Sequence, residues 1–119
     1  MLTNAGDGVK PETKFRNNVV YPFLRGLRNI HYFSIQQTTL VGHPDMVICL
    51  NGHFVALELK DVDGHLSAIQ NYHLQQVENA GGLAFVASLD NWDVVKHRLT
   101  LIDQGEYKWE KILPLSTRN

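Results

Sequence analysis

The dipeptide Asn51-Gly52 constrains the fold of this chain more than any other stretch. Short runs of alternating apolar residues flank it, and Asn-Gly in that setting is the strongest local signal for a β-hairpin with a two-residue turn. Pairing outward from this turn places Asp45 opposite Glu58. A symmetric four-residue loop would give the same pairs, whereas a three-residue loop or a bulge would change them. We therefore predict that two carboxylates face each other across the hairpin.

Two opposed carboxylates need a physical explanation. Directly opposed residues on antiparallel strands have Cβ atoms roughly 4.5–5.5 Å apart, and like charges at that distance destabilise the sheet. Without a cation between them, one carboxylate would move toward protonation. Because side chains alternate along a strand, Lys60 lies on the same face as Glu58, roughly 6.6 Å further along. Asp45, Glu58 and Lys60 therefore converge in a geometry that suits a divalent metal ion beside a phosphate.

Length and composition indicate one globular domain over residues 1–119, with residues 1–10 as a flexible lead-in. No apolar run reaches the roughly eighteen residues of a membrane span, and the first residues lack the apolar centre of a signal peptide. We therefore expect a cytoplasmic protein that does not bind membranes. The single cysteine, Cys49, excludes an internal disulfide, and its place in a strand predicts a small buried apolar side chain.

Charge is distributed unevenly along the chain. The net charge of -1 argues against a generic basic nucleic-acid binder. Lysines and arginines nevertheless gather in residues 1–28, whereas residues 61–95 contain none. Any phosphate-binding surface is therefore expected at the two ends of the chain.

The first expected helix begins at Pro11, because proline fits the first turn, where its missing N–H costs nothing. Pro22 should kink or split this helix. The apolar stripe of the helix has a spacing of four residues and consists of Phe15, Val19, Phe23 and Leu27.

Glu12 falls within that stripe rather than opposite it, and an inward-facing carboxylate needs a reason. One interpretation is a residue near the end of a helix, favoured by the helix dipole and paired with Arg16 one turn on. The other interpretation places Glu12 in the same metal site as Asp45 and Glu58. The sequence alone leaves both open.

Local signals predict the next elements. Residues 31–40 are rich in β-branched and aromatic side chains and predict a strand, with Phe33, Ile35 and Gln37 on one face. Residues 61–65 form a loop after the hairpin. Residues 67–80 form a helix that opens with the capping box of Ser67 and Gln70 and closes with an αL cap at Gly81-Gly82.

Residues 83–88 are a continuous apolar run, which is typical of a strand buried on both faces. A strand reached through a helix is normally parallel to its neighbour, in a right-handed crossover. Asp90 or Asn91 caps a further helix whose apolar residues are Trp92, Val95 and Leu99. The tail fits either a strand or a packed extension, with Tyr107, Trp109 and Ile112. The expected order of helix, three strands, helix, strand and helix gives an α/β domain with a mixed four-stranded sheet.

Three motifs occur in order around the hairpin: Gly42-His43-Pro44-Asp45, then Glu58-Leu59-Lys60, then Gly64-His65-Leu66-Ser67 followed by Gln70. Together they resemble the PD-(D/E)XK nuclease superfamily, and within it most closely the VRR-NUC family and the archaeal-type Holliday junction resolvases. The resemblance covers roughly residues 11–88. It implies a restriction-endonuclease-like αβββαβ core with a mixed four-stranded sheet flanked by helices.

The resemblance also implies a metal site. Asp45, Glu58 and the backbone carbonyl of Leu59 would bind Mg²⁺ or Mn²⁺. Glu12 matches the acidic residue that the superfamily often supplies from its first helix. Carboxylate oxygens hold Mg²⁺ in an octahedral shell that keeps several waters, and such an ion lowers the pKa of a bound water and polarises a phosphoryl group.

Two further residues complete the implied catalytic set. Lys60 would lie beside the attacking water or the scissile phosphate, where a compact positive charge stabilises developing negative charge. Gln70 matches the glutamine at the start of the superfamily's next helix. The catalytic residues that the resemblance implies are Glu12, Asp45, Glu58, Lys60 and Gln70.

The implied activity is that of a metal-dependent, structure-selective DNA endonuclease in a bacterial or phage-infected cell, with Holliday junctions among the candidate substrates. A symmetric homodimer would supply two sites for paired nicks on opposing strands. Residues 36–39 lack the basic side chains that junction resolvases commonly carry there, which leaves the substrate open between a four-way junction, a flap, a nick and plain duplex. The residues expected to contact DNA are Lys10, Lys14, Arg16 and His43.

Simpler explanations exist for each residue alone. Asp45 can be a turn residue, Glu58 and Lys60 a solvated strand face, Gln70 half of a capping box, and His43 an exposed turn residue. Jointly these explanations leave the opposed carboxylates unexplained.

The alternative function is a non-catalytic module that binds nucleic acid or protein on a nuclease fold. The histidines match no zinc-site spacing, and both tryptophans are expected in the core rather than as base-stacking platforms, namely Trp92 and Trp109.

Overall fold

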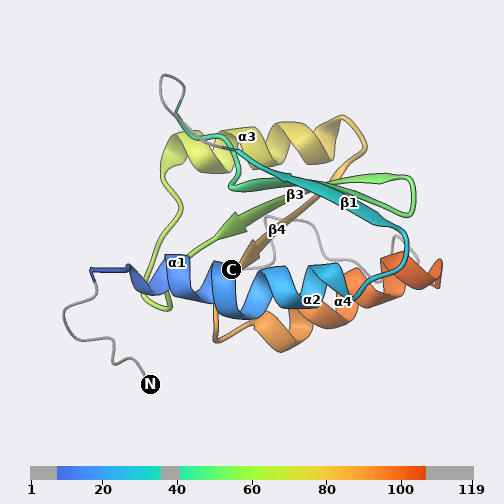
Figure 1. Ribbon diagram of the computed structural model, residues 1–119. Helices are drawn as coiled ribbons and strands as arrows, with labels where there is room; N and C mark the ends of the chain where they lie inside the picture. The colour runs from blue at the N-terminus through green and yellow to red at the C-terminus, as the bar shows by residue number, and fades with distance from the viewer. Residues whose placement is uncertain (1–7, 36–40, 107–119) are drawn as a thin grey trace.

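Helices lie on both faces of a four-stranded sheet in the computed structural model, which describes residues 8–35 and 41–106 (Figure 1). One face carries α3 (Ala68–Asn79). The other face carries α1 (Pro11–Phe15), the π-helix η1 (Arg16–Val20), α2 (Tyr21–Arg25) and α4 (Trp92–Gln104). The sheet order is β1-β2-β3-β4, with bounds Ile30–Ser34, Met46–Leu50, His53–Leu59 and Leu83–Ala87. The predicted α/β class with a mixed four-stranded sheet flanked by helices is confirmed.

The hairpin has the predicted turn and register. Asn51 and Gly52 have φ angles of 50° and 83°, and a type I′ turn requires positive φ at both central residues. β2 and β3 pair antiparallel up to Met46 opposite Leu57. The next position outward is that of Asp45 and Glu58, as predicted.

The N-terminal helical stretch is continuous past Pro22 but not regular (Figure 1). The interruption predicted at this proline takes the form of the π-helix, in which the Tyr21 N–H donates to the Arg16 carbonyl, five residues back. The wide turn displaces the apolar stripe by one residue, so that the buried side chains are Phe15, Val20 and Leu24. The stripe predicted at a strict spacing of four is confirmed in part, since its other members pack against the core but are only partly buried, namely Val19, Phe23 and Leu27.

β1 is shorter than predicted and ends at Ser34. Its core-facing residues are Ile30 and Tyr32, whereas Phe33 is 63% exposed. The predicted face of Phe33 and Ile35 is therefore not the core face. Residues 36–40 lie outside the described residues, and Gln37 with them.

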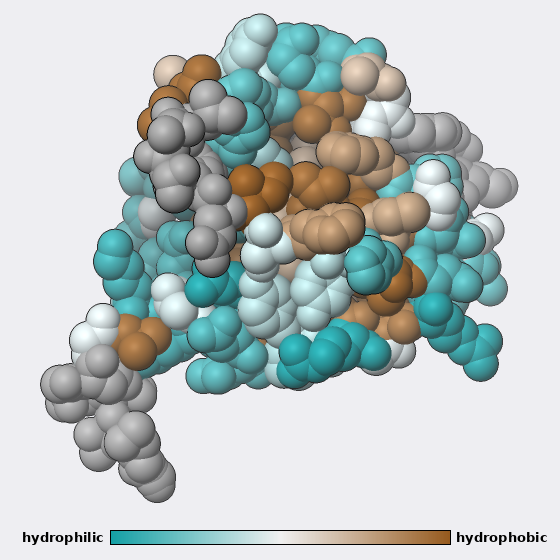
Figure 2. Space-filling view, turned by 45° about the horizontal axis from the view of Figure 1, so that its top comes forward, coloured by the Kyte–Doolittle hydropathy of each residue, from teal (hydrophilic) through white to brown (hydrophobic). Residues whose placement is uncertain are grey.

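Cys49 is exposed, so the prediction of a buried apolar side chain is wrong. β2 directs alternate residues into the core, and Cys49 points to the opposite face, between His31 of β1 and Phe54 of β3. Figure 2 shows apolar side chains gathered in the middle of this side of the molecule. The core side of β2 consists of Met46, Ile48 and Leu50.

Both predicted caps of α3 are present. The Gln70 N–H donates to Ser67 Oγ at 3.2 Å, and the Ser67 N–H donates to Gln70 Oε1 at 2.9 Å. At the other end Gly81 has a φ of 98°, and the Gly82 N–H donates to the Val77 carbonyl at 2.9 Å. The Gly81 N–H donates to the carbonyl of the residue three positions before it, and the two bonds together form a Schellman motif.

β4 runs parallel to β3 and is buried nearly throughout, as predicted. Asn91 is the N-cap of α4, but its side chain does not cap the helix. It instead accepts from the Ser88 N–H and donates to the Val86 carbonyl, each at 2.8 Å. Trp92 is a core residue, in edge-to-face contact with Phe15 of α1 and with Phe23 of α2. Trp109 and the rest of the tail lie outside the described residues.

None of the helices in the described ranges combines the length and the apolar character that crossing a membrane requires.

Candidate functional site

The open end of the β2–β3 hairpin holds the predicted carboxylate pair. Asp45 directly precedes β2, and its Oδ2 accepts the Leu59 N–H at 2.7 Å. Its backbone carbonyl accepts the Ile35 N–H at 2.8 Å. Asp45 lies close enough to Glu58 for its charge to raise the pKa of that carboxyl. The structure therefore brings these two residues together, and backbone donors from the neighbouring strands fix the orientation of Asp45.

Glu58 is 3% exposed, which is unusual for a carboxylate. Its Oε2 accepts from Gln70 Nε2 at 3.0 Å and lies 3.6 Å from Lys60 Nζ. Its Oε1 is buried and has no hydrogen-bond donor among the described residues. Of the predicted convergence of Asp45, Glu58 and Lys60, the contact of Lys60 with Glu58 is present, and Gln70, which the resemblance implied, also reaches Glu58.

Gln70 combines the two roles that the sequence left as alternatives. Its Oε1 accepts the Ser67 N–H in the capping box, and its Nε2 donates to Glu58. An amide has both an acceptor and a donor end, so one side chain can do both. The start of α3 is thereby tied to the carboxylate pair.

The surroundings of Asp45 and Glu58 disfavour a state in which both carboxyl groups are charged. Burial, and after it the charge of Asp45, raise the pKa of Glu58 from 4.5 to about 8, although Lys60 opposes the shift. Burial also raises the pKa of Asp45, although the hydrogen bond from the Leu59 N–H and the positive charge of Lys60 lower it. Below about pH 8 the metal-free pair therefore favours a protonated Glu58.

Glu12 lies on α1 within electrostatic range of the pair. Burial and then the charge of Asp45 raise the pKa of Glu12, while Lys60 and Arg16 lower it. Both sequence interpretations of Glu12 thus find support, because Arg16 and the site act on it together. Across residues 8–35 and 41–106, however, no three His, Cys, Asp or Glu side chains form a group that could hold a metal ion. The structure brings Glu12 near the pair without closing a three-carboxylate cluster.

A divalent ion fits the pair by the chemistry of its donors. Mg²⁺ is usually held by one or two carboxylates and keeps several waters, so a third protein carboxylate is not required. The donorless Oε1 of Glu58 is a buried oxygen that a cation would satisfy. Leu59 contributes its N–H to Asp45, and its carbonyl stays a predicted ligand.

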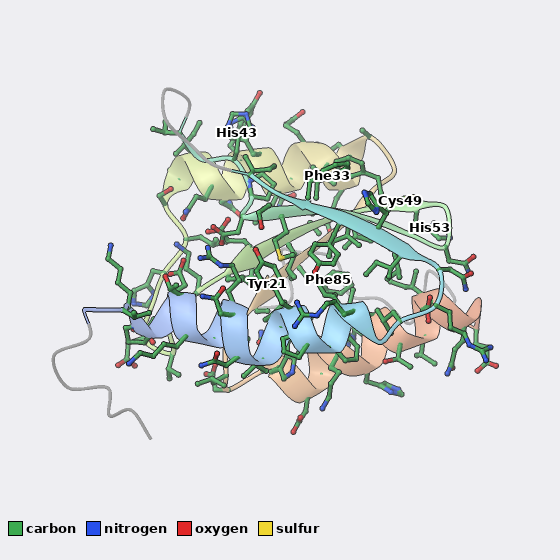
Figure 3. All side chains as sticks on the ribbon, viewed as in Figure 1. Tyr21, Phe33, His43, Cys49, His53 and Phe85 are labelled. Carbon is green, nitrogen blue, oxygen red and sulfur yellow. The ribbon has the colours of Figure 1, made fainter. Side chains whose placement is uncertain are left out.

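The predicted DNA-contacting residues divide into two groups. Arg16 lies close enough to Asp45 and Glu12 to lower both pKa values. Lys14 is half-buried on α1, and Lys10 is exposed just before it. His43 instead stacks on His73 of α3, with ring centroids 4.9 Å apart (Figure 3).

His43 also lines a separate cavity of about 470 Å³ between α3 and the sheet, which Lys60 does not line. The structure thus groups Arg16 with the carboxylates and places His43 against α3.

A larger cavity of about 750 Å³ adjoins Lys60. Its lining residues come from the loop 61–66, the first turns of α3 and the end of β4, and the cavity is open to solvent on one side. Sequence reasoning missed this cavity and its polar residues Asn71 and Ser88. Neither residue belongs to a local motif, and their segments meet only because α3 packs against β4, which pairs with β3.

The chain matches no protein-family model, no curated protein and no solved structure. The resemblance to PD-(D/E)XK nucleases therefore rests on the residues quoted above. What the protein does has to be inferred from the geometry and chemistry of the site itself.

Proposed function

We propose that this protein is a metal-dependent DNA endonuclease that hydrolyses phosphodiester bonds in branched or otherwise distorted DNA. The observation that carries the proposal is the directly opposed pair of Asp45 and Glu58, one of whose oxygens is buried without a donor. Such a pair destabilises the metal-free sheet. A protein that only binds a partner has no physical use for it, whereas a metal-dependent hydrolase does.

Each residue of the pair is held in place before any ligand binds. The Leu59 N–H orients Asp45, and Gln70 orients Glu58. Preorganised carboxylates lose little freedom when they bind a cation. Mg²⁺ or Mn²⁺ bound there would polarise the scissile phosphate and lower the pKa of a water.

Lys60 supplies the positive charge of the site. Its Nζ is held 3.6 Å from Glu58 Oε2, and its side chain is only 16% exposed. A compact ammonium in such a partly desolvated position stabilises negative charge that develops on phosphoryl oxygens, and it can orient the attacking water. Arg16, together with Lys14, offers contacts for the flanking phosphates. A homodimer would place two such sites on opposing strands.

Calorimetric titration with Mg²⁺ or Mn²⁺ tests the metal site. We expect the wild-type protein to bind the ion and Asp45→Ala to lose binding. The matched control is Asp93→Ala, which removes a 98% exposed carboxylate on α4 and should leave binding unchanged. No metal binding by the wild type, or equal binding by Asp45→Ala, would refute the site.

Cleavage of a panel of four-way junction, flap, nicked and linear duplex DNA tests the reaction. With Mg²⁺ or Mn²⁺ the wild type should nick the branched substrates, and Lys60→Ala should fold but lose cleavage. Lys96→Ala removes a lysine from the other face of the sheet and serves as the control. Activity that survives in both Asp45→Asn and Lys60→Ala would refute the catalytic assignment.

A binding module without cleavage is the second candidate. The observation in its favour is that the described residues hold no group of three metal-ligating side chains. It predicts DNA or protein binding that is independent of Mg²⁺ and unchanged in Asp45→Asn, with no nicked product from any substrate. The same DNA panel therefore separates the two candidates.

A further inference from the structure

The 750 Å³ cavity beside Lys60 has the size of a small-molecule site, since such sites typically enclose roughly 300–1,000 Å³. Its walls combine apolar side chains, Val62, Leu66 and Val86, with polar ones from α3 and the end of β4. Mixed walls of this kind suit a flat heterocyclic ring that has polar atoms on its edge. The dimensions and the lining therefore fit a ligand that is larger than a metal ion or a phosphate.

The charges around the cavity favour a neutral ligand. Among the residues that the structure describes, Lys60 is the only lysine or arginine that lines it, whereas Asp61 and Asp90 both line it. A phosphate would meet two carboxylates and gain one ammonium, so its binding is disfavoured. Asp90 also accepts a hydrogen bond from the Ser88 hydroxyl, which keeps that carboxylate at the wall.

The amide of Asn71 is the group best placed to recognise such a ring. Asn71 is exposed and lines the cavity. An Asn amide offers one donor and one acceptor side by side, the pattern that matches the edge of a nucleobase. Asn91, which also lines the cavity, is already engaged with Ser88 and Val86.

The cavity is directly connected to the carboxylate pair. Gln70 donates to Glu58, and the next residue, Asn71, lines the cavity. Lys60 belongs to both places, since it lies by Glu58 and also lines the cavity. A nucleotide adjacent to a phosphate at Lys60 would therefore have the cavity within reach.

We propose that this cavity binds one unpaired nucleobase of the nucleotide next to the scissile phosphate. The inference rests on the proposed function for its choice of DNA as the ligand. In continuous duplex the base would have to be unpaired and unstacked first, whereas in a bulge or a single-stranded flap the base is already unpaired. The base site would thus explain a preference for distorted DNA in a chain with little surface for reading a sequence.

The test uses a duplex with a single bulged 2-aminopurine, whose fluorescence reports stacking, and the same duplex with that base paired. All proteins carry Asp45→Asn, so that no DNA is cut. The cavity variants are Asn71→Leu, which replaces the amide with an apolar group of the same branched shape, and Ala68→Leu, which adds bulk at the wall. Asn79→Leu makes the same exchange as the first variant at an exposed position in the last turn of α3.

We expect the parent protein and Asn79→Leu to bind the bulged duplex more tightly than the paired one. Asn71→Leu and Ala68→Leu should weaken binding of the bulged duplex roughly five- to tenfold and leave binding of the paired duplex unchanged. Equal binding of both duplexes by the parent protein would overturn the proposal. So would bulge binding that neither cavity variant weakens.

A separate cleavage assay with the wild type and Mg²⁺ keeps the two proposals apart. If the bulge preference depends on Asn71 but no DNA is cut, the nuclease proposal fails and the base site stands. If the wild type cuts DNA but the cavity variants bind the bulge as tightly as their parent, the base site fails and the nuclease proposal stands.

Discussion

Among the residues that the structure describes, two carboxylates are almost fully buried, Asp103 at 5% exposure and Glu58 at 3%, and their surroundings differ completely. The Asp103 oxygens accept the backbone N–H groups of Arg28 and Asn29, at 3.0 and 2.8 Å. Glu58 shares its site with another carboxylate and has one oxygen without a donor among the described residues. Asp103 lies near the turn end of the hairpin, where its neighbour Ile102 accepts a hydrogen bond from the turn, and Glu58 lies at the open end.

The difference teaches that burial alone does not identify a functional carboxylate. A buried charge with a full set of donors fixes two segments of chain together and stabilises the fold. A buried charge that faces a like charge and lacks a donor costs stability, and such costs concentrate at functional sites. The turn end of the hairpin therefore stabilises the fold, whereas the open end carries an unfavourable carboxylate pair that the proposed cation would relieve.

Asp45→Asn should have the largest effect and should separate activity from stability. Without one carboxylate the site loses a ligand, and Mg²⁺-dependent cleavage should fall roughly a thousandfold or more. The free energy of unfolding at pH 8 should stay equal or rise, because the variant removes one of two like charges while its amide oxygen still accepts the Leu59 N–H. Cleavage rates and urea unfolding measure the two effects.

A fall in both quantities would contradict the comparison. It would mean that Asp45 is chiefly a structural acceptor, like Asp103, and that the two ends of the hairpin are not built for different purposes.

Asp103→Ala should have the next largest effect, on stability alone. It leaves two backbone N–H groups without their charged acceptor, and we expect a loss of about 3 kcal/mol in the free energy of unfolding. Urea unfolding measures the loss, with the exposed Asp93→Ala as the control. Calorimetry should show unchanged Mg²⁺ binding by the folded variant, and a loss of that binding would tie Asp103 to the site.

Features set by local sequence were predictable. The positive φ values of Asn51 and Gly52 fix a two-residue turn, and the turn fixes every pair along β2 and β3. The pairing of Asp45 with Glu58 follows from that register alone. The caps of α3 are equally local, whereas the contact of Gln70 with the site was expected only from the family resemblance.

Features that depend on packing between distant segments were not predictable. The displaced stripe of the first helix results from the π turn before Pro22, and a fixed α-helical spacing cannot anticipate a five-residue step. The exposure of Cys49 depends on how far the helix on that face extends over the sheet. The donor set of Asp103 comes from residues more than seventy positions away, and the cavity at Asn71 needs three separate segments.

The pH dependence of stability should isolate the open end of the hairpin. The pKa of Glu58 is about 8 in the folded state and 4.5 as its ordinary value. Between these pH values the folded protein keeps a proton that the unfolded chain has released, so the contribution of Glu58 to stability falls as the pH rises from 4.5 to 8. Glu58→Gln removes this dependence.

We therefore expect Glu58→Gln to match the wild type near pH 4 and to exceed it by about 1–2 kcal/mol at pH 8. Urea unfolding of both proteins across this range measures the difference, and taking the difference cancels the groups that they share. A difference that stays constant with pH would show that Glu58 ionises in the folded state as it does in the unfolded chain.

The smallest effect should come from the turn itself. Asn51 has a φ of 50°, and its Nδ2 donates to the Ile102 carbonyl at 3.0 Å. Asn51→Ala loses the hydrogen bond and puts at positive φ a residue that tolerates the left-handed conformation less well than asparagine does, which together should cost about 1–2 kcal/mol. Asn51→Gly loses the hydrogen bond alone and should cost less, because glycine adopts positive φ freely.

If the turn end only stabilises the register, cleavage by the folded fraction of either variant should equal that of the wild type. A selective loss of cleavage in Asn51→Ala would instead show that the turn sets the alignment of Asp45 with Glu58, and the two ends of the hairpin would then be coupled.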